Sequence, residues 1–197
     1  MRVLCVAVCL LTFATFSTAA RGNRVEGAVE SSPTSNTDTK RAKEYKLKAA
    51  FLYNFCLFTT WPKEAFEKED SPIVVGVFGK DPYGSALDVA FKKKQVGKRS
   101  FRIERYATAK DIKPCHLIFV PSGAVKQMPE ALKKLKDKHT LIVGESTGFV
   151  LKGGAVGFYA EKKKIRFEVN TAETKRRNLT ISSKLLKLAR IVKEPKK

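Results

Sequence analysis

The chain has 197 residues, of which 43% are hydrophobic, and it carries 39 lysines and arginines against 19 aspartates and glutamates. This length and apolar content are ordinary for one globular domain with a single core. After residue 20 no apolar run is long enough to cross a bilayer, so we expect no membrane helix in the mature protein.

The N-terminus has the pattern of a signal peptide. Met1-Arg2 gives a positive start, the stretch 3–16 is almost wholly apolar, and small residues follow up to Ala20. We expect residues 1–20 to be removed and the mature protein to work in the bacterial periplasm. The alternative, an uncleaved anchor helix, is disfavoured because the apolar stretch is shorter than the ~20 residues that span a bilayer.

The strongly basic charge, +20 overall, attracts polyanions in general. Export argues against nucleic acid as the working partner. Because the lysines and arginines are scattered along the chain, they favour a solvated surface with weak attraction to an anionic membrane face.

The mature chain begins with a polar, Ser/Thr-rich stretch without apolar periodicity, so residues 21–40 are predicted to be a disordered linker. The folded domain is expected over 41–192, and a disordered tail over 193–197. The first element is a mostly buried helix, Arg41–Thr60, which ends before Pro62.

Buried strands and helices then alternate along the chain. Continuous apolar runs predict strands covered on both faces, and the alternating stretch 99–106 predicts a half-exposed strand. In order, we expect strand Ile73–Phe78, helix Ser85–Lys93, strand Arg99–Tyr106, strand His116–Val120, helix Ala124–Lys136, strand Thr140–Val143, a hairpin of Ala155–Ala160 with Ile165–Asn170, and helices Thr171–Arg177 and Ser182–Val192.

This order predicts an α/β fold: a mostly parallel sheet with helices on both faces, in three layers, with an antiparallel hairpin at one edge. Ligands of such sheets bind at the carboxyl ends of the strands. The residues there form a candidate crevice for a ligand or partner: Gly79, Asp81, Pro82, Tyr83, Ser122, Gly144, Ser146, Gly148, Phe149 and Asn170.

One stretch, 144–148, matches the G-x-S-x-G motif of hydrolases. A helix should follow the serine, but a loop and a strand are predicted instead. Both histidines, His116 and His139, also precede Ser146, against the order of that fold. We therefore expect a Gly-rich turn and no catalytic residue.

Cofactor sites are equally poorly supported. The loop 79–84 has glycines at a phosphate-loop spacing but lacks the Lys and Ser/Thr that hold nucleotide and magnesium. Cys115 and His116 are adjacent in a strand and point to opposite faces, which disfavours a metal site. We expect no metal and no cofactor.

Two cysteines, Cys56 and Cys115, remain after the signal peptide. In an oxidising compartment they could form one disulfide. Both lie in apolar patterns, so two separate buried thiols are the other reading.

Several ordered stretches together resemble the YfiR family of periplasmic proteins. They span about Ala42 to Val192 and comprise Glu44–Phe55 with Trp61-Pro62, Val77–Gly84, Cys115–Val120, Val143–Phe149 with Gly153-Gly154, Ile165–Asn170 and Ile181–Arg190.

The resemblance implies regulation without catalysis. Such a protein would bind and repress the periplasmic region of an inner-membrane signalling protein, a diguanylate cyclase or a sensor kinase. An outer-membrane lipoprotein would relieve the repression, and cyclic di-GMP and biofilm formation would follow. The resemblance leaves a homodimer open. It also implies stabilising disulfides in some members: Cys115 is at a matching position, but Val75-Gly76-Val77 holds no partner cysteine.

Two other functions stay open. Residues 170–192 are also similar to the last helical segment of periplasmic solute-binding proteins, which favours a small-ligand sensor, although the chain is too short for two lobes. The second open function is that of a hydrolase acting through Ser146.

Overall fold

The structure is a computed structural model that describes residues 36–136 and 138–193. Within these residues a seven-stranded sheet has the strand order β3-β2-β4-β5-β6-β7-β9, and β1 and β8 form a separate two-stranded sheet. The strands are β1 (Thr59–Thr60), β2 (Ile73–Phe78), β3 (Phe101–Tyr106), β4 (Leu117–Val120), β5 (Leu141–Gly144), β6 (Val156–Glu161), β7 (Lys164–Asn170), β8 (Thr180–Ile181) and β9 (Arg190–Val192).

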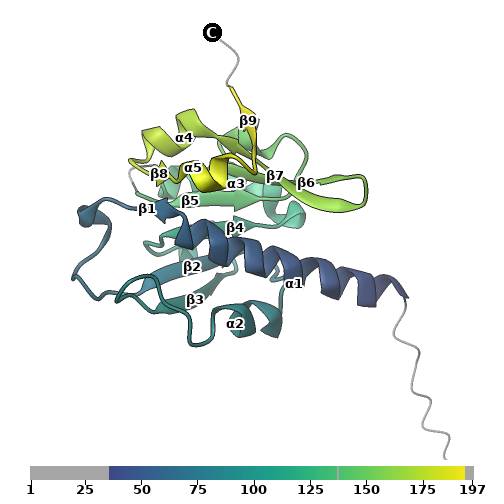
Figure 1. Cartoon of the computed structure of the whole chain (residues 1–197), viewed down its shortest axis with the longest axis horizontal. Coiled ribbons are helices and arrows are strands. Elements are labelled where there is room, and N and C mark those ends of the chain that lie inside the picture. The colour runs from purple at the N-terminus through teal and green to yellow at the C-terminus, as the bar shows by residue number, and fades with distance from the viewer. Residues whose placement is uncertain (1–35, 137, 194–197) are drawn as a thin grey trace, which may run out of the picture. The chain divides into compact units, whose positions relative to one another are not determined.

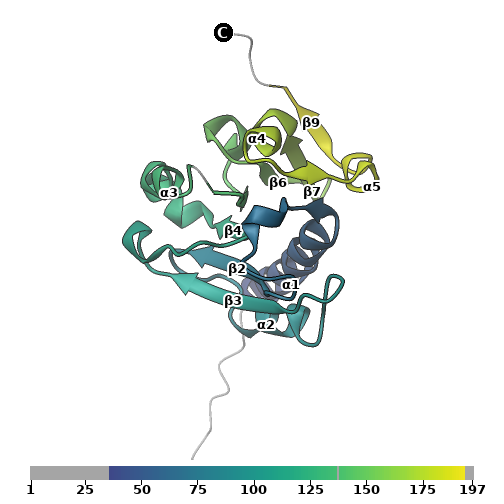
Figure 2. The same ribbon diagram turned by 90° about the vertical axis from the view of Figure 1, so that its left-hand side faces the viewer.

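Helices cover both faces of the large sheet. They are α1 (Asn36–Leu57), α2 (Ser85–Phe91), α3 (Met128–Lys134), α4 (Thr171–Arg176) and α5 (Ser183–Leu186), with short 3₁₀ helices η1 (Lys63–Ala65), η2 (Ala109–Asp111), η3 (Ser122–Gln127) and η4 (Phe149–Lys152). Figure 1 shows α1 running across the front of the sheet, and Figure 2 shows α1 and α3 on opposite sides of the strands.

All pairings in the large sheet are parallel except that of β6 with β7, which is antiparallel. The predicted α/β class, the mostly parallel sheet and the antiparallel hairpin are confirmed. One more strand, β9, pairs with β7 and forms the edge outside the hairpin.

The core has two apolar clusters, one on each face of the sheet. Val75 and Val77 of β2 belong to the cluster under α1, whereas Val74 and Phe78 belong to the cluster under α3. Since successive side chains of a strand point to opposite faces, the fully buried run IVVGVF supplies both clusters at once.

The two cysteines lie in different clusters. Cys56 of α1 is in the first and Cys115, just before β4, is in the second, so the sheet separates them. Both are free thiols, and the alternative of a Cys56–Cys115 disulfide is wrong. Burial raises the pKa of the Cys56 thiol far above its usual range and that of Cys115 to about 12.

Several predicted elements differ from the structure, and the largest differences concern helices. Helix α1 begins at Asn36 instead of Arg41, so it includes the last residues of the predicted linker, and it ends at Leu57 because Thr59 and Thr60 pair with β8. The helix predicted over 124–136 is η3 followed by α3, where Pro129 lies in the first turn.

The last predicted helix, Ser182–Val192, is wrong over its second half. Only Ser183–Leu186 is α-helical, and Arg190–Val192 pairs with Glu168–Asn170 of β7 as strand β9. The predicted signal peptide, most of the predicted linker and most of the predicted tail lie outside the described residues. Among the described helices, none is long and apolar enough to cross a membrane.

Candidate functional site

A crevice of about 660 Å³ lies where β2, β4 and β5 end, against the first turns of α1. Parallel strands end at the same edge of the sheet, which is why loops far apart in sequence meet here. Its lining residues are Arg41, Glu44, Tyr45, Gly79, Lys80, Asp81, Pro82, Ala107, Pro121, Ser122, Gly123, Ala124, Gln127 and Glu145.

The structure brings part of the predicted crevice together. Gly79, Asp81, Pro82 and Ser122 line it. Tyr83 is buried beside it and packs edge-to-face against Tyr45, with ring centroids 5.2 Å apart. The remaining predicted residues do not line this crevice: Gly144, Ser146, Gly148, Phe149 and Asn170.

Glu145 is the polar centre of this crevice. The sequence placed its loop, 144–148, at the strand ends but did not single out Glu145. Its carboxylate accepts hydrogen bonds from the Tyr45 hydroxyl at 3.0 Å and from the Ser122 N–H at 3.2 Å. It also forms an ion pair of 2.6 Å with Lys48, and both side chains are only 7% exposed. Its position directly after a buried strand was the available signal.

The two tyrosines remain neutral phenols. Burial raises the pKa of Tyr45 well above its usual range, and the neighbouring Glu145 carboxylate raises it further. Burial, and then Glu145, raise the pKa of Tyr83 in the same way. Tyr45 therefore keeps its proton and donates it to Glu145 across the biological pH range.

Asp81 has a mainly structural role. One carboxylate oxygen accepts the Tyr83 N–H at 2.7 Å, which closes a turn before α2. The other accepts a hydrogen bond of 2.7 Å from Arg105, which also pairs with Asp88 of α2 at 2.6 Å. These contacts fix the loop between β2 and α2 against β3.

The G-x-S-x-G stretch is explained by packing. A Cβ at Gly144 would lie 2.3 Å from the Phe149 ring, and one at Gly154 would lie 2.2 Å from it, so the ring fits between two glycines. Gly148 has a φ of 66°, which glycine adopts without strain. Within the described chain the buried Ser146 hydroxyl has no hydrogen-bond partner.

The histidines are engaged elsewhere. His116 Nδ1 accepts a hydrogen bond of 3.0 Å from the Val74 N–H, so Nε2 carries the proton and donates to the Ala65 carbonyl at 3.0 Å. His139 Nδ1 lies 3.0 Å from the Arg177 carbonyl. Neither ring hydrogen bonds to Ser146 in the part of the chain that the structure describes.

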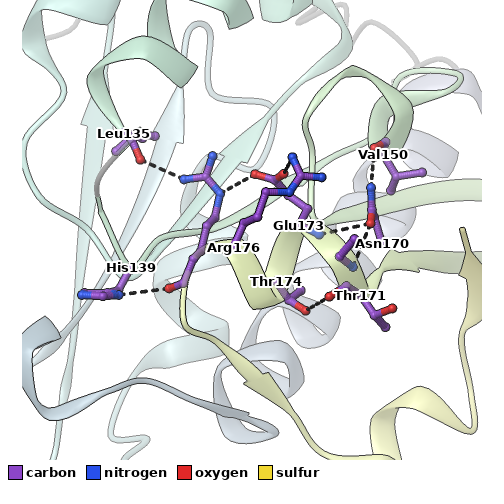
Figure 3. A network of polar contacts seen from close by, with 10 residues as sticks. Leu135, His139, Val150, Asn170, Thr171, Glu173, Thr174 and Arg176 are labelled. Atoms are coloured by element: carbon purple, nitrogen blue, oxygen red, sulfur yellow. Dashed lines mark hydrogen bonds and ion pairs between the residues drawn. The ribbon is translucent and has the colours of Figure 1, made fainter. Parts of the chain in front are cut away.

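Asn170 caps helix α4 instead of lining the crevice. Its side-chain oxygen accepts the N–H groups of Ala172 and Glu173, and its amide donates to the Val150 carbonyl at 3.2 Å. Figure 3 shows this cap beside Glu173, whose carboxylate pairs with Arg177 and Arg176, each at 2.8 Å. Arg177 reaches the Leu135 carbonyl at 2.8 Å, so the network joins α4 to the end of α3.

Metal ligands do not cluster in the described residues: no group of three or more His, Cys, Asp or Glu side chains there could hold an ion. His116 packs against Phe66, with stacked rings 4.4 Å apart, while Cys115 lies in the cluster on the opposite face. The crevice is lined by charged groups of both signs: the cations Arg41 and Lys80, and the acids Glu44, Asp81 and Glu145.

The sequence over residues 45–190 matches the family model described as YfiR/HmsC-like. The chain belongs to the YfiR/HmsC-like family. The match covers the domain from the middle of α1 to the beginning of β9, and it confirms the resemblance seen in the sequence. No curated protein matches the sequence.

Among solved structures, a conserved domain protein from Vibrio cholerae is similar to this YfiR/HmsC-like chain with a TM-score of 0.52 and 9% identity, covering 76% of this chain and 60% of that one. This likeness concerns the fold alone. The ABC domain in complex with L-Trp from Streptococcus pneumonia has a TM-score of 0.46 and 10% identity, covering 60% of this chain and 55% of that one. The chain thus spans little more than half the length of these two structures.

Proposed function

We propose that this YfiR/HmsC-like domain is a periplasmic regulator that binds and represses an inner-membrane signalling protein, most specifically a diguanylate cyclase that controls cyclic di-GMP and biofilm formation. The observation that carries the proposal is the family match over residues 45–190. It comprises nearly all of the described domain, so the proposed activity belongs to the whole fold and not to an appended motif.

Repression of this kind is a shift in an equilibrium. The domain binds the inactive arrangement of the cyclase's periplasmic region more tightly than the active one, and it shifts the population only by that difference in affinity. An outer-membrane lipoprotein that competes for the domain would release the cyclase. Neither step requires a catalytic side chain in this chain.

Gene deletion tests this proposal. Cyclic di-GMP and biofilm should rise in the deletion strain and return to the parental level when the full chain is supplied. A version without residues 1–20, which stays in the cytoplasm, should fail to restore repression. Unchanged cyclic di-GMP in the deletion strain, with the candidate cyclase present, would contradict the proposal.

A small-ligand sensor is the second candidate, and the crevice at the strand ends favours it. Its volume of about 660 Å³ is in the usual range for small-molecule sites, and it combines the phenol of Tyr45 with charged side chains of both signs. A screen of periplasmic metabolites by thermal shift tests it. A ligand should raise the melting temperature at micromolar concentration, and Arg41→Glu should abolish the shift while the exposed Lys110→Glu, outside the crevice, should not.

A further inference from the structure

A second hollow, which adjoins the crevice at Tyr45 and Pro82, lies between helices α1 and α2. It is a groove of about 1030 Å³, and we call it the α1–α2 groove. The two helices lie side by side in both views (Figures 1 and 2). Its lining residues are Ala42, Lys43, Tyr45, Lys46, Leu47, Ala50, Tyr53, Asn54, Pro82, Tyr83, Gly84, Ser85, Ala86, Val89, Ala90 and Lys94.

The walls of the groove are apolar and open to solvent. Leu47 is 48% exposed and Val89 is 66% exposed, although both are large hydrophobic side chains. The helix flanks between them carry small residues, Ala50, Ala86 and Ala90, which leave room for another segment. A contiguous exposed apolar surface of this kind marks an interaction site more often than isolated exposed residues do.

The charges at the groove are all positive. Lys43, Lys46 and Lys94 line it, and no acidic residue is among its lining residues. The Lys94 ammonium group lies over the Tyr53 ring, 5.5 Å from its centre, and both side chains line the groove. The acidic residue within α2, Asp88, is paired with Arg105 of β3.

We propose that the α1–α2 groove is the docking surface for the partner and that its occupant is an amphipathic helix with an acidic polar face. The apolar face of that helix packs between Leu47 and Val89, in the way that amphipathic helices bind hydrophobic grooves in general. Its carboxylates pair with Lys43, Lys46 and Lys94. This inference rests on the proposed function, since it assigns the surface through which the repressor binds.

Charge complementarity selects this occupant over a second copy of the chain. A copy that used the same groove would bring its own lysines against these three, and the chain as a whole carries a net charge of +20. Like charges across an interface oppose association. An acidic helix gains both from the apolar walls and from the lysines.

A binding assay with a model peptide tests the groove directly. The probe is an 18-residue fluorescent peptide with Leu at positions i, i+3, i+4 and i+7 and Glu on its other face, together with a counterpart in which Lys replaces every Glu. The acidic peptide should bind the mature protein, with an affinity that falls as salt rises, and the basic peptide should not bind.

Matched variants separate the groove from the general positive charge. Val89→Glu should weaken binding of the acidic peptide at least ten-fold, while Leu188→Glu, at a side chain that is 69% exposed outside the groove, should leave it unchanged. Lys43→Glu with Lys46→Glu should weaken binding more than Lys162→Glu with Lys163→Glu at the β6–β7 turn. The proposal would be overturned if Val89→Glu and Leu188→Glu weakened peptide binding equally. It would also be overturned if the two double lysine variants did so. A dimer that Val89→Glu dissociates would also overturn it, because the groove would then bind a second copy.

The same variants in cells distinguish this inference from the proposed function. If deletion raises cyclic di-GMP, then Leu188→Glu should restore repression and Val89→Glu should not, with equal periplasmic levels of both proteins. Full repression by Val89→Glu would overturn the groove while the regulator stands. No rise of cyclic di-GMP in the deletion strain would refute the regulator, and the peptide assay would still decide whether the groove binds an acidic helix.

Discussion

The Phe149 ring fills a slot that only glycine leaves open. It is fully buried, and any Cβ at Gly144 or Gly154 would lie well inside contact distance of its carbon atoms. The first glycine of the G-x-S-x-G stretch is thus required by an aromatic ring five positions later. The third position of that stretch, Ser146, takes no part in this contact.

Replacing Gly144 with alanine should lower the free energy of unfolding by about 1–3 kcal/mol, because the added methyl group overpacks the slot. Urea denaturation measures the loss. In a Phe149→Leu background the same substitution should cost less, since the smaller side chain yields. Simple additivity of the two single changes would show that the ring is not the cause.

His116 gives the domain a pH dependence of its own. Burial lowers the pKa of its imidazole to about 4, against a usual value of 6.5, and the nearby Arg99 and Arg102 also lower it, whereas the hydrogen bond to the Ala65 carbonyl raises it. The unfolded chain therefore binds a proton between these two pH values and the folded chain does not. Stability should fall as the pH drops from about 6.5 to about 4, by at most about 3 kcal/mol.

The variant His116→Phe should remove that part of the pH dependence. At neutral pH it should also unfold more easily by about 1–3 kcal/mol, because the Val74 N–H loses its acceptor. The free energy of unfolding measured against pH for both proteins tests this. Parallel curves between pH 4 and 6.5 would mean that other groups produce the effect.

Helix α1 contributes to the core, to the crevice and to the α1–α2 groove. Its buried side carries Ala49, Leu52 and Phe55 into the core. Its first turns line the crevice, and its residues from Ala42 to Asn54 line the α1–α2 groove. Tyr45 lines both hollows. The charge of Lys48 on this helix is held by Glu44 at 2.5 Å and by Glu145 at 2.6 Å.

The substitution Glu145→Ala should destabilise the protein by about 3 kcal/mol, because it removes the buried partner of a buried lysine. Adding Lys48→Met should recover part of this loss. The exposed pair of Lys98 and Glu69, 3.5 Å apart with side chains 79% and 85% exposed, is the control. Glu69→Ala should cost less than about 1 kcal/mol. Equal losses for Glu145→Ala and Glu69→Ala, by thermal or urea unfolding, would contradict the assignment.

Elements with a strong local pattern were predictable. The run IVVGVF was predicted as a strand with the bounds that the structure has, and the hairpin of β6 and β7 was nearly so. Where a distant strand decides the conformation, the prediction was wrong: Arg190–Val192 continues a helical apolar pattern but pairs with β7. Backbone hydrogen bonds to a neighbouring strand outweigh the small differences in local propensity.

For the candidate site, the sequence predicted which loops meet at the crevice but only some of the side chains that line it. Strand order alone put Gly79, Asp81, Pro82 and Ser122 at one edge of the sheet. The loop 144–148 was placed there too, but Glu145 was not singled out within it, because its partners Tyr45 and Lys48 are about one hundred positions away in the chain. The α1–α2 groove was not predicted, because small residues on two helices form a groove only when the two helices pack side by side.

For the protein as a whole, the fold class and the family could be predicted without a structure, since both depend on the order of apolar runs and on motifs that are local in the chain. The three-dimensional structure was needed to show that Cys56 and Cys115 are free thiols, because the sheet lies between them. It also decided which side chains share the crevice and where an apolar surface stays exposed between positive charges. Such properties arise from contacts between residues far apart in sequence, and these contacts exist only after packing has brought them together.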